Sequence, residues 1–303
     1  MADNDSVLAA ARAWQGARLA LATVVSTWGS APRPVGSHML VHEDGRFEGS
    51  VSGGCVEADI LQAAAEVIAG APAMVKHYGV ADPAAWEVGL PCGGKISVLV
   101  QPVSEMGFPP ALFDAIDAAR GRGEPFDVGT DLATGRSAPG PGGFRNRYDP
   151  PRRLLIVGAV QIAQSLAGLA REIGIRTHVI DPRGRFLTPE RFPGVMLDDR
   201  WPDEAVTALR PDPATAVVTL SHDPKIDDAA LVAALGFPTG YVAALGSRSS
   251  HAARRERLAA AGIAPTDLDR IQGPAGLAIG AIGPAEIALS IAAAMVKTFH
   301  DHP

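Results

Sequence analysis

The second half of the chain alternates regularly between short apolar runs and segments with helical spacing. Residues 154–157 have the pattern of a buried strand, apolar residues then recur at helical spacing from Ile162 to Ile173, and Gly174 ends that helix. The same half contains further strand patterns at 177–180, 216–220 and 241–245, a polar helix at about 250–261 and a final helix that begins at Pro284. Strands that alternate with helices through short loops predict a Rossmann-like, doubly wound parallel sheet, which we place at residues 153–303.

The first half shows no such alternation. Strand patterns occur at 19–26, 37–42, 47–51, 73–78 and 95–100, and helical patterns at 56–69 and 111–120. The turn His42-Glu43-Asp44-Gly45-Arg46 predicts a hairpin. We therefore predict a small α+β domain over residues 1–130, so that the whole chain is of the α/β class with two domains.

Residues 131–152 separate the two patterns. This stretch is rich in glycine and proline and has almost no apolar periodicity. Such a composition is typical of a linker or a long surface loop. We predict a linker here.

Charge, composition and cysteine content exclude several classes of protein. The chain has 303 residues, 47% of them hydrophobic, and its 27 Lys and Arg against 33 Asp and Glu give a net charge of −6. This balance argues against a general nucleic-acid binder, which needs surplus positive charge. Met1–Ser6 lacks the features of a signal peptide, and the apolar stretch 273–296 is too interrupted to span a membrane. Because no signal peptide or membrane span is evident, we expect a cytoplasmic protein with no membrane partner. The two cysteines of the chain are too few for a disulfide framework.

The loops after the predicted parallel strands raise the question of nucleotide binding. Asp181 lies 23 residues beyond Gly158, close to the spacing at which a carboxylate meets a ribose hydroxyl in NAD(P)-binding domains. Val160, however, occupies the place of the glycine that lets the backbone approach a pyrophosphate. Two interpretations stay open: an NAD(P)-dependent oxidoreductase, with a cysteine or His222 in catalysis, or a Rossmann-like domain with altered or lost nucleotide binding.

A serine-rich segment before a predicted helix is a second candidate. Ser247 and Arg248 offer a hydroxyl and a guanidinium where helix N–H groups attract anions. The alternative is ordinary helix capping by Ser249 or Ser250 beside a solvated arginine.

Both cysteines of the chain stand beside a pair of glycines. Cys55 follows Gly53-Gly54 where a loop enters a helix, a position that favours the thiolate, and Cys92 precedes Gly93-Gly94 and Lys95 just before a strand. Glycines permit positive φ and the close approach of a bulky ligand. These residues predict one shared site, although small buried cysteines at tight turns are the alternative.

The loop at residues 28–36 is a further candidate. It contains Trp28, a serine, two glycines and Arg33. An arginine and hydroxyl in such a loop are suited to a phosphate or a fused heterocycle. A rigid connection with a surface arginine is the alternative.

Taken together, these motifs resemble the XdhC/CoxI family, accessory proteins of molybdenum hydroxylases such as xanthine dehydrogenase. The resemblance covers both halves of the chain and is carried by GSAPRPVGSHMLV (29–41), GSVSGGCVEADIL (49–61), GLPCGGKISVLVQP (89–102), IDPRGRF (180–186), RFP (191–193), SHDPKIDD (221–228), ALGSRSSHAARRERL (244–258) and RIQGPAGLAIGA (270–281). It implies a small N-terminal domain followed by a Rossmann-like domain.

The resemblance also implies a function. Members of this family bind molybdenum cofactor transiently, protect it while its sulfur ligand is installed, and deliver it to an apo molybdenum hydroxylase. A cysteine desulfurase and a second copy of the chain are the other implied partners, and the accessory protein has no turnover of its own. The implied metal ligands are Cys55 and Cys92, and the other implied cofactor-binding residues are Gly53, Gly54, Gly93, Gly94, Arg33, Ser247 and Arg248.

Three positions depart from the family pattern. Relatives often carry histidine at the positions of Gln161 and Gln272, and aspartate at that of Ala278. These departures leave two interpretations of the second domain open: cofactor handling resides mainly in the first domain, or this member of the family is specialised or degraded. A third hypothesis, a non-catalytic assembly scaffold that recognises an apo-enzyme, also stays open.

Overall fold

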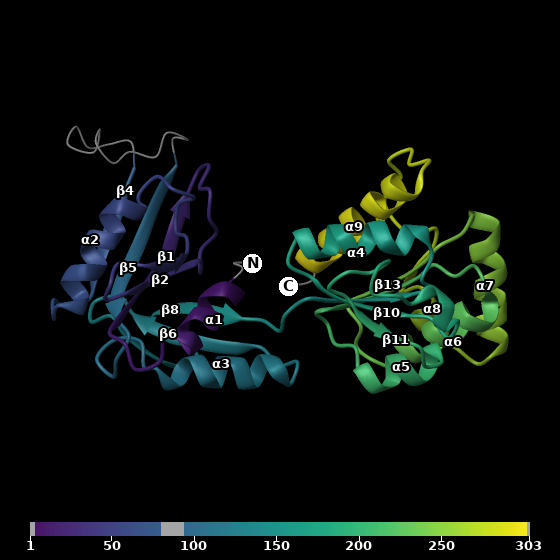
Figure 1. Cartoon of the computed structure of the whole chain (residues 1–303), viewed down its shortest axis with the longest axis horizontal. Coiled ribbons are helices and arrows are strands. Elements are labelled where there is room, and N and C mark those ends of the chain that lie inside the picture. Colours follow the sequence, from purple (N-terminus) through teal and green to yellow (C-terminus); the bar gives the residue numbers. More distant parts are fainter. Residues whose placement is uncertain (1–3, 80–93, 302–303) are drawn as a thin grey trace. The chain divides into compact units, whose positions relative to one another are not determined.

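The computed structural model describes residues 4–79 and 94–301. The chain divides into two compact units, residues 1–150 and 151–303. Each unit has its own sheets and its own core (Figure 1).

The first unit is built on a five-stranded antiparallel sheet. Its strands have the order β3-β2-β1-β5-β4. Their bounds are β1 (Leu19–Trp28), β2 (His38–His42), β3 (Phe47–Gly49), β4 (Met74–Tyr78) and β5 (Lys95–Pro102). Helix α2 (Glu57–Ile68) packs on one face, where Ile60 and Ala64 join the alternate residues Ala22 and Val24 of β1 in one core. The predicted hairpin and the helix in this region are therefore confirmed.

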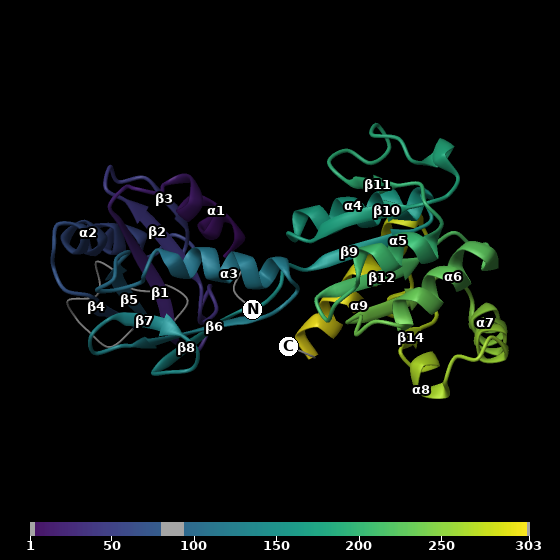
Figure 2. The same ribbon diagram turned by 90° about the horizontal axis from the view of Figure 1, so that it is seen from below.

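The other face of this sheet is covered by two helices and a second, smaller sheet. The helices are α1 (Asp5–Ala13) and α3 (Ala111–Gly121), and the strands are β6 (Phe126–Asp131), β7 (Arg136–Pro139) and β8 (Phe144–Tyr148), in the order β7-β6-β8 (Figure 2). Leu21 and Leu40 of the first sheet pack with Ile116 of α3 and Val128 of β6. Helix α1 and these three strands were not predicted from the sequence.

The predicted linker at residues 131–152 contains the strands β7 and β8, so this prediction was wrong for those two segments. Its glycines stand in the turns between the strands: Gly135 and Gly140 have φ of +70° and +94°. Ser137 and Tyr148 are buried within the short strands themselves. Strands this short give too little alternation to be distinguished from loop by composition.

A buried polar cluster joins the two sheets of the first unit. The imidazole of His38 on β2 lies 2.9 Å from the Thr23 hydroxyl at Nδ1 and 2.6 Å from the Tyr148 hydroxyl at Nε2. Asn146 of β8 also reaches His38 Nε2, at 3.0 Å. Burial lowers the pKa of His38 to about 3, so the imidazole is neutral in the folded protein.

The second unit contains one six-stranded sheet whose neighbouring strands are all parallel. The order is β11-β10-β9-β12-β13-β14. The strands are β9 (Arg153–Val157), β10 (Arg176–Ile180), β11 (Met196–Asp198), β12 (Thr215–Thr219), β13 (Tyr241–Ala244) and β14 (Ile271–Gln272). The chain starts in the middle at β9, moves outward to β11 and returns to β12. The loops after β9 and β12 therefore meet at the switch point of a doubly wound sheet, and the predicted fold class is confirmed.

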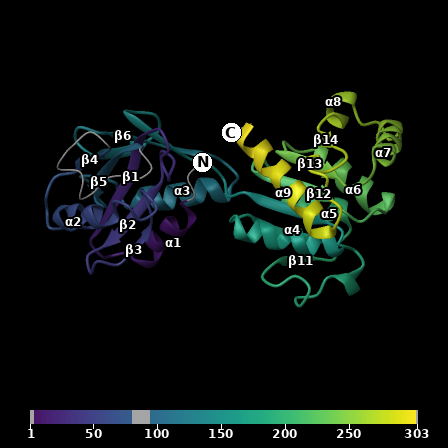
Figure 3. The same cartoon turned by 90° about the horizontal axis from the view of Figure 1, so that it is seen from above.

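Helices cover both faces of this sheet. Helices α4 (Gln161–Glu172) and α9 (Pro284–Asp301) lie side by side on one face (Figure 3). The opposite core includes residues of α5 (Pro202–Leu209), α6 (Pro224–Leu235), α7 (Arg248–Ala260) and α8 (Pro265–Leu268), while the 3-10 helix η2 (Gly184–Phe186) follows β10. Leu154 and Ile156 pack in the core with α4 and α9, and Leu155 and Val157 pack in the opposite core. Strand β9 is therefore buried on both faces and apolar throughout.

Within residues 4–79 and 94–301, no helix has the length and apolar character needed to cross a membrane.

Candidate functional site

Three of the predicted segments meet at one end of the first sheet. A Cβ atom added to Gly94 would lie 2.7 Å from the carbonyl oxygen of Ser30 and 3.2 Å from that of Trp28. A Cβ atom on Gly53 would lie 3.7 Å from the Pro32 Cβ. The start of β5 and the loop before α2 are thus both packed against the loop that carries Arg33. Cys92 and Gly93 lie outside the described residues.

The loop before α2 is folded around one carboxylate, that of Glu57. Six donors converge on it: the hydroxyls of Ser50 and Ser52 and the backbone N–H groups of Val51, Ser52, Gly54 and Val56. Burial alone would raise the pKa of Glu57, but the hydrogen bonds from Ser50, Ser52 and the backbone outweigh it and hold the pKa at about 2. The carboxylate is therefore ionised.

Cys55 presents its side chain to solvent from this loop. Its N–H donates to the Ser52 hydroxyl at 2.9 Å, while the N–H of Gly53 donates to Ser50 and that of Gly54 to Glu57. These three amides are therefore engaged within the loop and not free to donate to a ligand. The exposed thiol is the reactive group that the loop offers.

Lys95 adds a cation to the same end of the sheet. It pairs in register with Trp28, and its ammonium lies 5.6 Å from the centre of the exposed indole ring. The Lys95 stem crosses Gly79, where an added Cβ would meet Lys95 Cγ at 2.7 Å. Arg33 is half-buried in the adjoining loop.

In the second unit, the carboxylate of Asp181, which was expected to bind a ribose, is buried and hydrogen-bonded within the protein. Asp181 at the end of β10 is fully buried, and its oxygens accept from the N–H of Ala159 at 2.8 Å and from the guanidinium of Arg183 at 2.8 and 2.9 Å. Burial would raise the pKa of Asp181, but the hydrogen bonds from Arg183 and Ala159 hold it below its usual value. Arg183 stacks on Phe186, 4.7 Å from the ring centre. A ribose diol would have to displace this guanidinium.

Ser247 is the N-cap of α7, accepting a hydrogen bond from Ser250 N–H at 3.1 Å. The predicted alternative to an anion site was capping by Ser249 or Ser250. This prediction was wrong in its residue, because the cap stands two or three positions earlier. Arg248 follows the cap and is exposed. Ser247 and Arg248, the two cofactor-binding residues predicted in this segment, thus lie in the second unit.

The residues that hold these loops were not among those predicted from the sequence. Glu57 in the first turn of α2, preceded by Ser50 and Ser52, is the signal that could have been used. Asp227 in the second unit is also a buried carboxylate that holds a loop, because it accepts a hydrogen bond from the Ser221 hydroxyl at 2.7 Å. Gln272, one of the departures from the family pattern, accepts from the Tyr241 hydroxyl and from Gly276 N–H.

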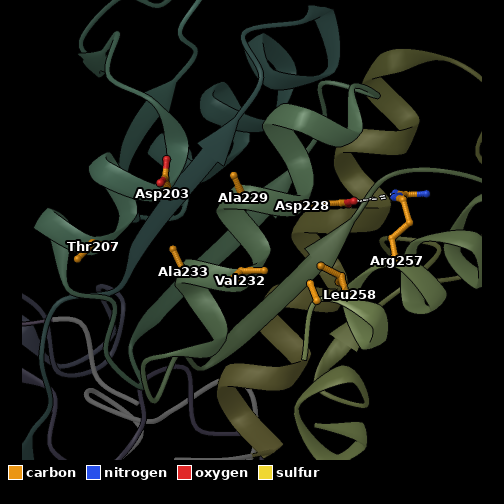
Figure 4. Close-up of a pocket in the computed structure, with 9 residues that line it drawn as sticks. Asp203, Thr207, Asp228, Ala229, Val232, Ala233, Arg257 and Leu258 are labelled. Atoms are coloured by element: carbon orange, nitrogen blue, oxygen red, sulfur yellow. Dashed lines mark hydrogen bonds and ion pairs between the residues drawn. The ribbon is translucent and has the colours of Figure 1, made fainter. Parts of the chain in front are cut away.

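A groove of about 450 Å³ lies between α5, α6 and α7, away from the predicted residues (Figure 4). Its floor is apolar, with Val232 and Leu258, and Asp228 on its rim is paired with Arg257 at 2.7 Å. In the described part of the chain, no group of three or more His, Cys, Asp or Glu residues is arranged to hold a metal ion.

Comparison with known proteins places the chain in a family. A profile described as the XdhC and CoxI family matches residues 13–79, and one described as the XdhC Rossmann domain matches residues 154–295. The molybdenum cofactor insertion chaperone PaoD of Escherichia coli is 30% identical, over 90% of this chain and 81% of PaoD. The chain belongs to the XdhC and CoxI family.

Two other relatives extend over nearly the whole molecule. A probable xanthine dehydrogenase subunit of Bacillus subtilis is 26% identical over 92% of each chain. A crystal structure described as a xanthine dehydrogenase from Bacillus halodurans has 26% identity and a TM-score of 0.80, covering all of this chain and 97% of the other. The family and fold expected from the motifs are confirmed.

Proposed function

We propose that this protein is an accessory factor of a molybdenum hydroxylase that binds molybdenum cofactor and delivers it to the apo-enzyme. The relatives named as a cofactor insertion chaperone and as part of a xanthine dehydrogenase support this role. The observation that carries the proposal is the exposed thiol of Cys55 on a loop fixed by Glu57, beside the Arg33 loop and Lys95.

The donor chemistry of this cluster fits the cofactor. A cysteine sulfur is a soft ligand suited to a molybdenum–sulfur centre, and Lys95 and Arg33 offer positive charge to an anionic pterin phosphate. When bound, the cofactor supplies the redox-active metal that the client enzyme uses. Cys55 would hold it, with Cys92 as the second thiol ligand and with Gly53, Gly54, Gly93 and Gly94 giving room for its approach.

Several finer points belong to the same proposal. An anion-binding role for Ser247 and Arg248 in handling the cofactor is one of them. A cysteine desulfurase would supply the sulfur ligand, and the protein would work as a cytoplasmic homodimer without turnover of its own.

Cofactor retention tests the proposal. Molybdenum and pterin per chain are measured after purification from cells that make the cofactor, for the wild type and for Cys55→Ala, Cys92→Ala and the double variant. We expect a stoichiometric complex for the wild type, and retention at least several-fold lower for each single variant. Full retention by the folded double variant would reject the cysteine role.

A client experiment separates delivery from simple scaffolding. A chaperone that delivers cofactor should bind the purified apo-hydroxylase of the same organism more strongly when loaded than when empty. Equal binding in both states would favour the assembly scaffold instead.

A further inference from the structure

The carboxylate of Glu57 anchors the Cys55 loop from inside, and each of its two oxygens accepts hydrogen bonds from a different set of loop donors. Oε1 of Glu57 accepts from Ser50 Oγ at 2.6 Å and from the N–H groups of Val51 and Ser52 at 3.2 and 2.9 Å. Oε2 accepts from Ser52 Oγ and from the N–H groups of Gly54 and Val56. Both halves of the loop therefore depend on the same carboxylate.

The path of the loop uses two backbone conformations that glycine adopts readily and other residues rarely adopt. Gly53 and Gly54 have φ of +76° and +115°, and the segment lies between β3 and α2 rather than inside either element. The amide of Cys55 is fixed by Ser52 Oγ, which itself donates to Glu57. A hydrogen-bonded chain thus runs from Glu57 through Ser52 to the backbone of the exposed cysteine.

We infer that Glu57 is the positioning residue of the Cys55 site: its carboxylate sets the loop conformation that directs the thiol outward, and cofactor retention depends on it. The inference rests on the proposed function of Cys55.

Glu57 acts through the loop rather than by touching the ligand. The residue is only 9% exposed, and both of its oxygens are already occupied by loop donors. Its negative charge would also repel an anionic cofactor. The carboxylate is needed because a carboxamide keeps one acceptor oxygen and places an NH₂ group against the remaining donors.

The test uses the full chain with Glu57→Gln, and Glu66→Gln as the matched control on the exposed side of the same helix. Amide hydrogen exchange over residues 51–56 and bound molybdenum per chain are measured for each. Losing hydrogen bonds to a charged acceptor should speed exchange in this segment by about ten-fold or more. We expect retention to fall several-fold in Glu57→Gln, to recover partly in Glu57→Asp, and to stay at the wild-type level in the control.

A second variant keeps the inference testable if Glu57→Gln does not fold. Ser52→Ala leaves the carboxylate but removes the hydroxyl that accepts from the N–H groups of Cys55 and Val56, so faster exchange should be confined to residues 55 and 56, and retention should again fall.

Two results would overturn the inference: wild-type retention in Glu57→Gln (or in Ser52→Ala, where Glu57→Gln fails to fold), or lost retention with unchanged exchange, which would mean that the carboxylate contacts the cofactor directly. Full retention by Cys55→Ser would instead reject the role of Cys55 in the proposed function, whatever Glu57→Gln does.

Discussion

Each unit contains a buried carboxylate that organises a loop, and the two carboxylates leave different groups for a ligand. Glu57 in the first unit binds backbone N–H groups and hydroxyls and leaves an exposed thiol. Asp181 in the second unit binds a guanidinium and the N–H groups of Ala159 and Arg183, and it leaves the outer edge of Arg183, whose side chain is 38% exposed. The first loop therefore presents an exposed thiol, and the second presents a cation.

A sequence motif does not show whether its carboxylate is free in the folded protein. Asp181 has the spacing of a ribose-binding carboxylate, yet both of its oxygens accept hydrogen bonds from the protein itself. Through Ala159 and Arg183, Asp181 ties the loops after β9 and β10 together.

The largest expected effect is on the stability of the second unit. Asp181→Ala leaves Arg183 and Ala159 N–H without their buried partner and should lower the free energy of unfolding by about 3 kcal/mol. Asp198→Ala is the matched control, because Asp198 pairs with Arg200 two residues later in the same way but closer to solvent. It should cost under about 1 kcal/mol. Denaturant titration measures both, and equal losses would contradict the special role of Asp181.

A pH dependence is expected for the first unit. The unfolded chain protonates His38 near its ordinary pKa of 6.5, whereas the folded protein resists protonation down to about pH 3. Stability from this group is complete above pH 6.5 and is lost as the pH falls toward 3, by on the order of 1.4 kcal/mol per unit. The free energy of unfolding should fall between pH 7 and pH 4.5 by about 2.5 kcal/mol more in the wild type than in His38→Gln. An NMR titration of the imidazole with a midpoint near 6.5 would contradict this account.

A smaller effect is expected at the start of α7. Ser247→Ala removes the N-cap and should cost about 1 kcal/mol of stability. Asp223→Ala, which removes the cap of α6, is the control for capping alone. If Ser247 also binds the cofactor, Ser247→Ala should lower retention of molybdenum and Asp223→Ala should not. Equal retention in both variants would limit Ser247 to capping.

The smallest expected effect distinguishes two obstacles to nucleotide binding. Fluorescence titration of the wild type with NADH and NADPH should show no binding below about 1 mM. Val160→Gly restores the missing glycine but leaves Asp181 paired with Arg183, so binding should tighten by less than about three-fold, or 0.6 kcal/mol. Micromolar binding by the wild type would favour an NAD(P)-dependent oxidoreductase, and a ten-fold gain in Val160→Gly would identify Val160 as the main obstacle.

Local patterns predicted most of the second unit and less of the first. The apolar runs at 154–157 and 177–180 correspond to β9 and β10, because a strand buried on both faces must be apolar throughout. The composition of the short strands β7 and β8 predicts a linker instead. These strands are stabilised by pairing with β6, which the local pattern does not show. The sequence also marked Gly53, Cys55 and Arg33 as candidates, but Glu57 went unnoticed because a glutamate in a first helical turn is common on exposed surfaces.

The amino-acid sequence by itself determined the α/β class, the Rossmann-like second unit and the family, because these depend on periodicity and on motifs that are local in the chain. Only the tertiary structure decided which groups remain free for a ligand. Whether the Gly54 amide or the Asp181 carboxylate is available depends on partners such as Glu57 and Arg183, whose hydrogen bonds form only when the loops fold around them. Hydrogen-bonding capacity used inside the protein is not available to a ligand, and the order of residues along the chain does not show how it is divided.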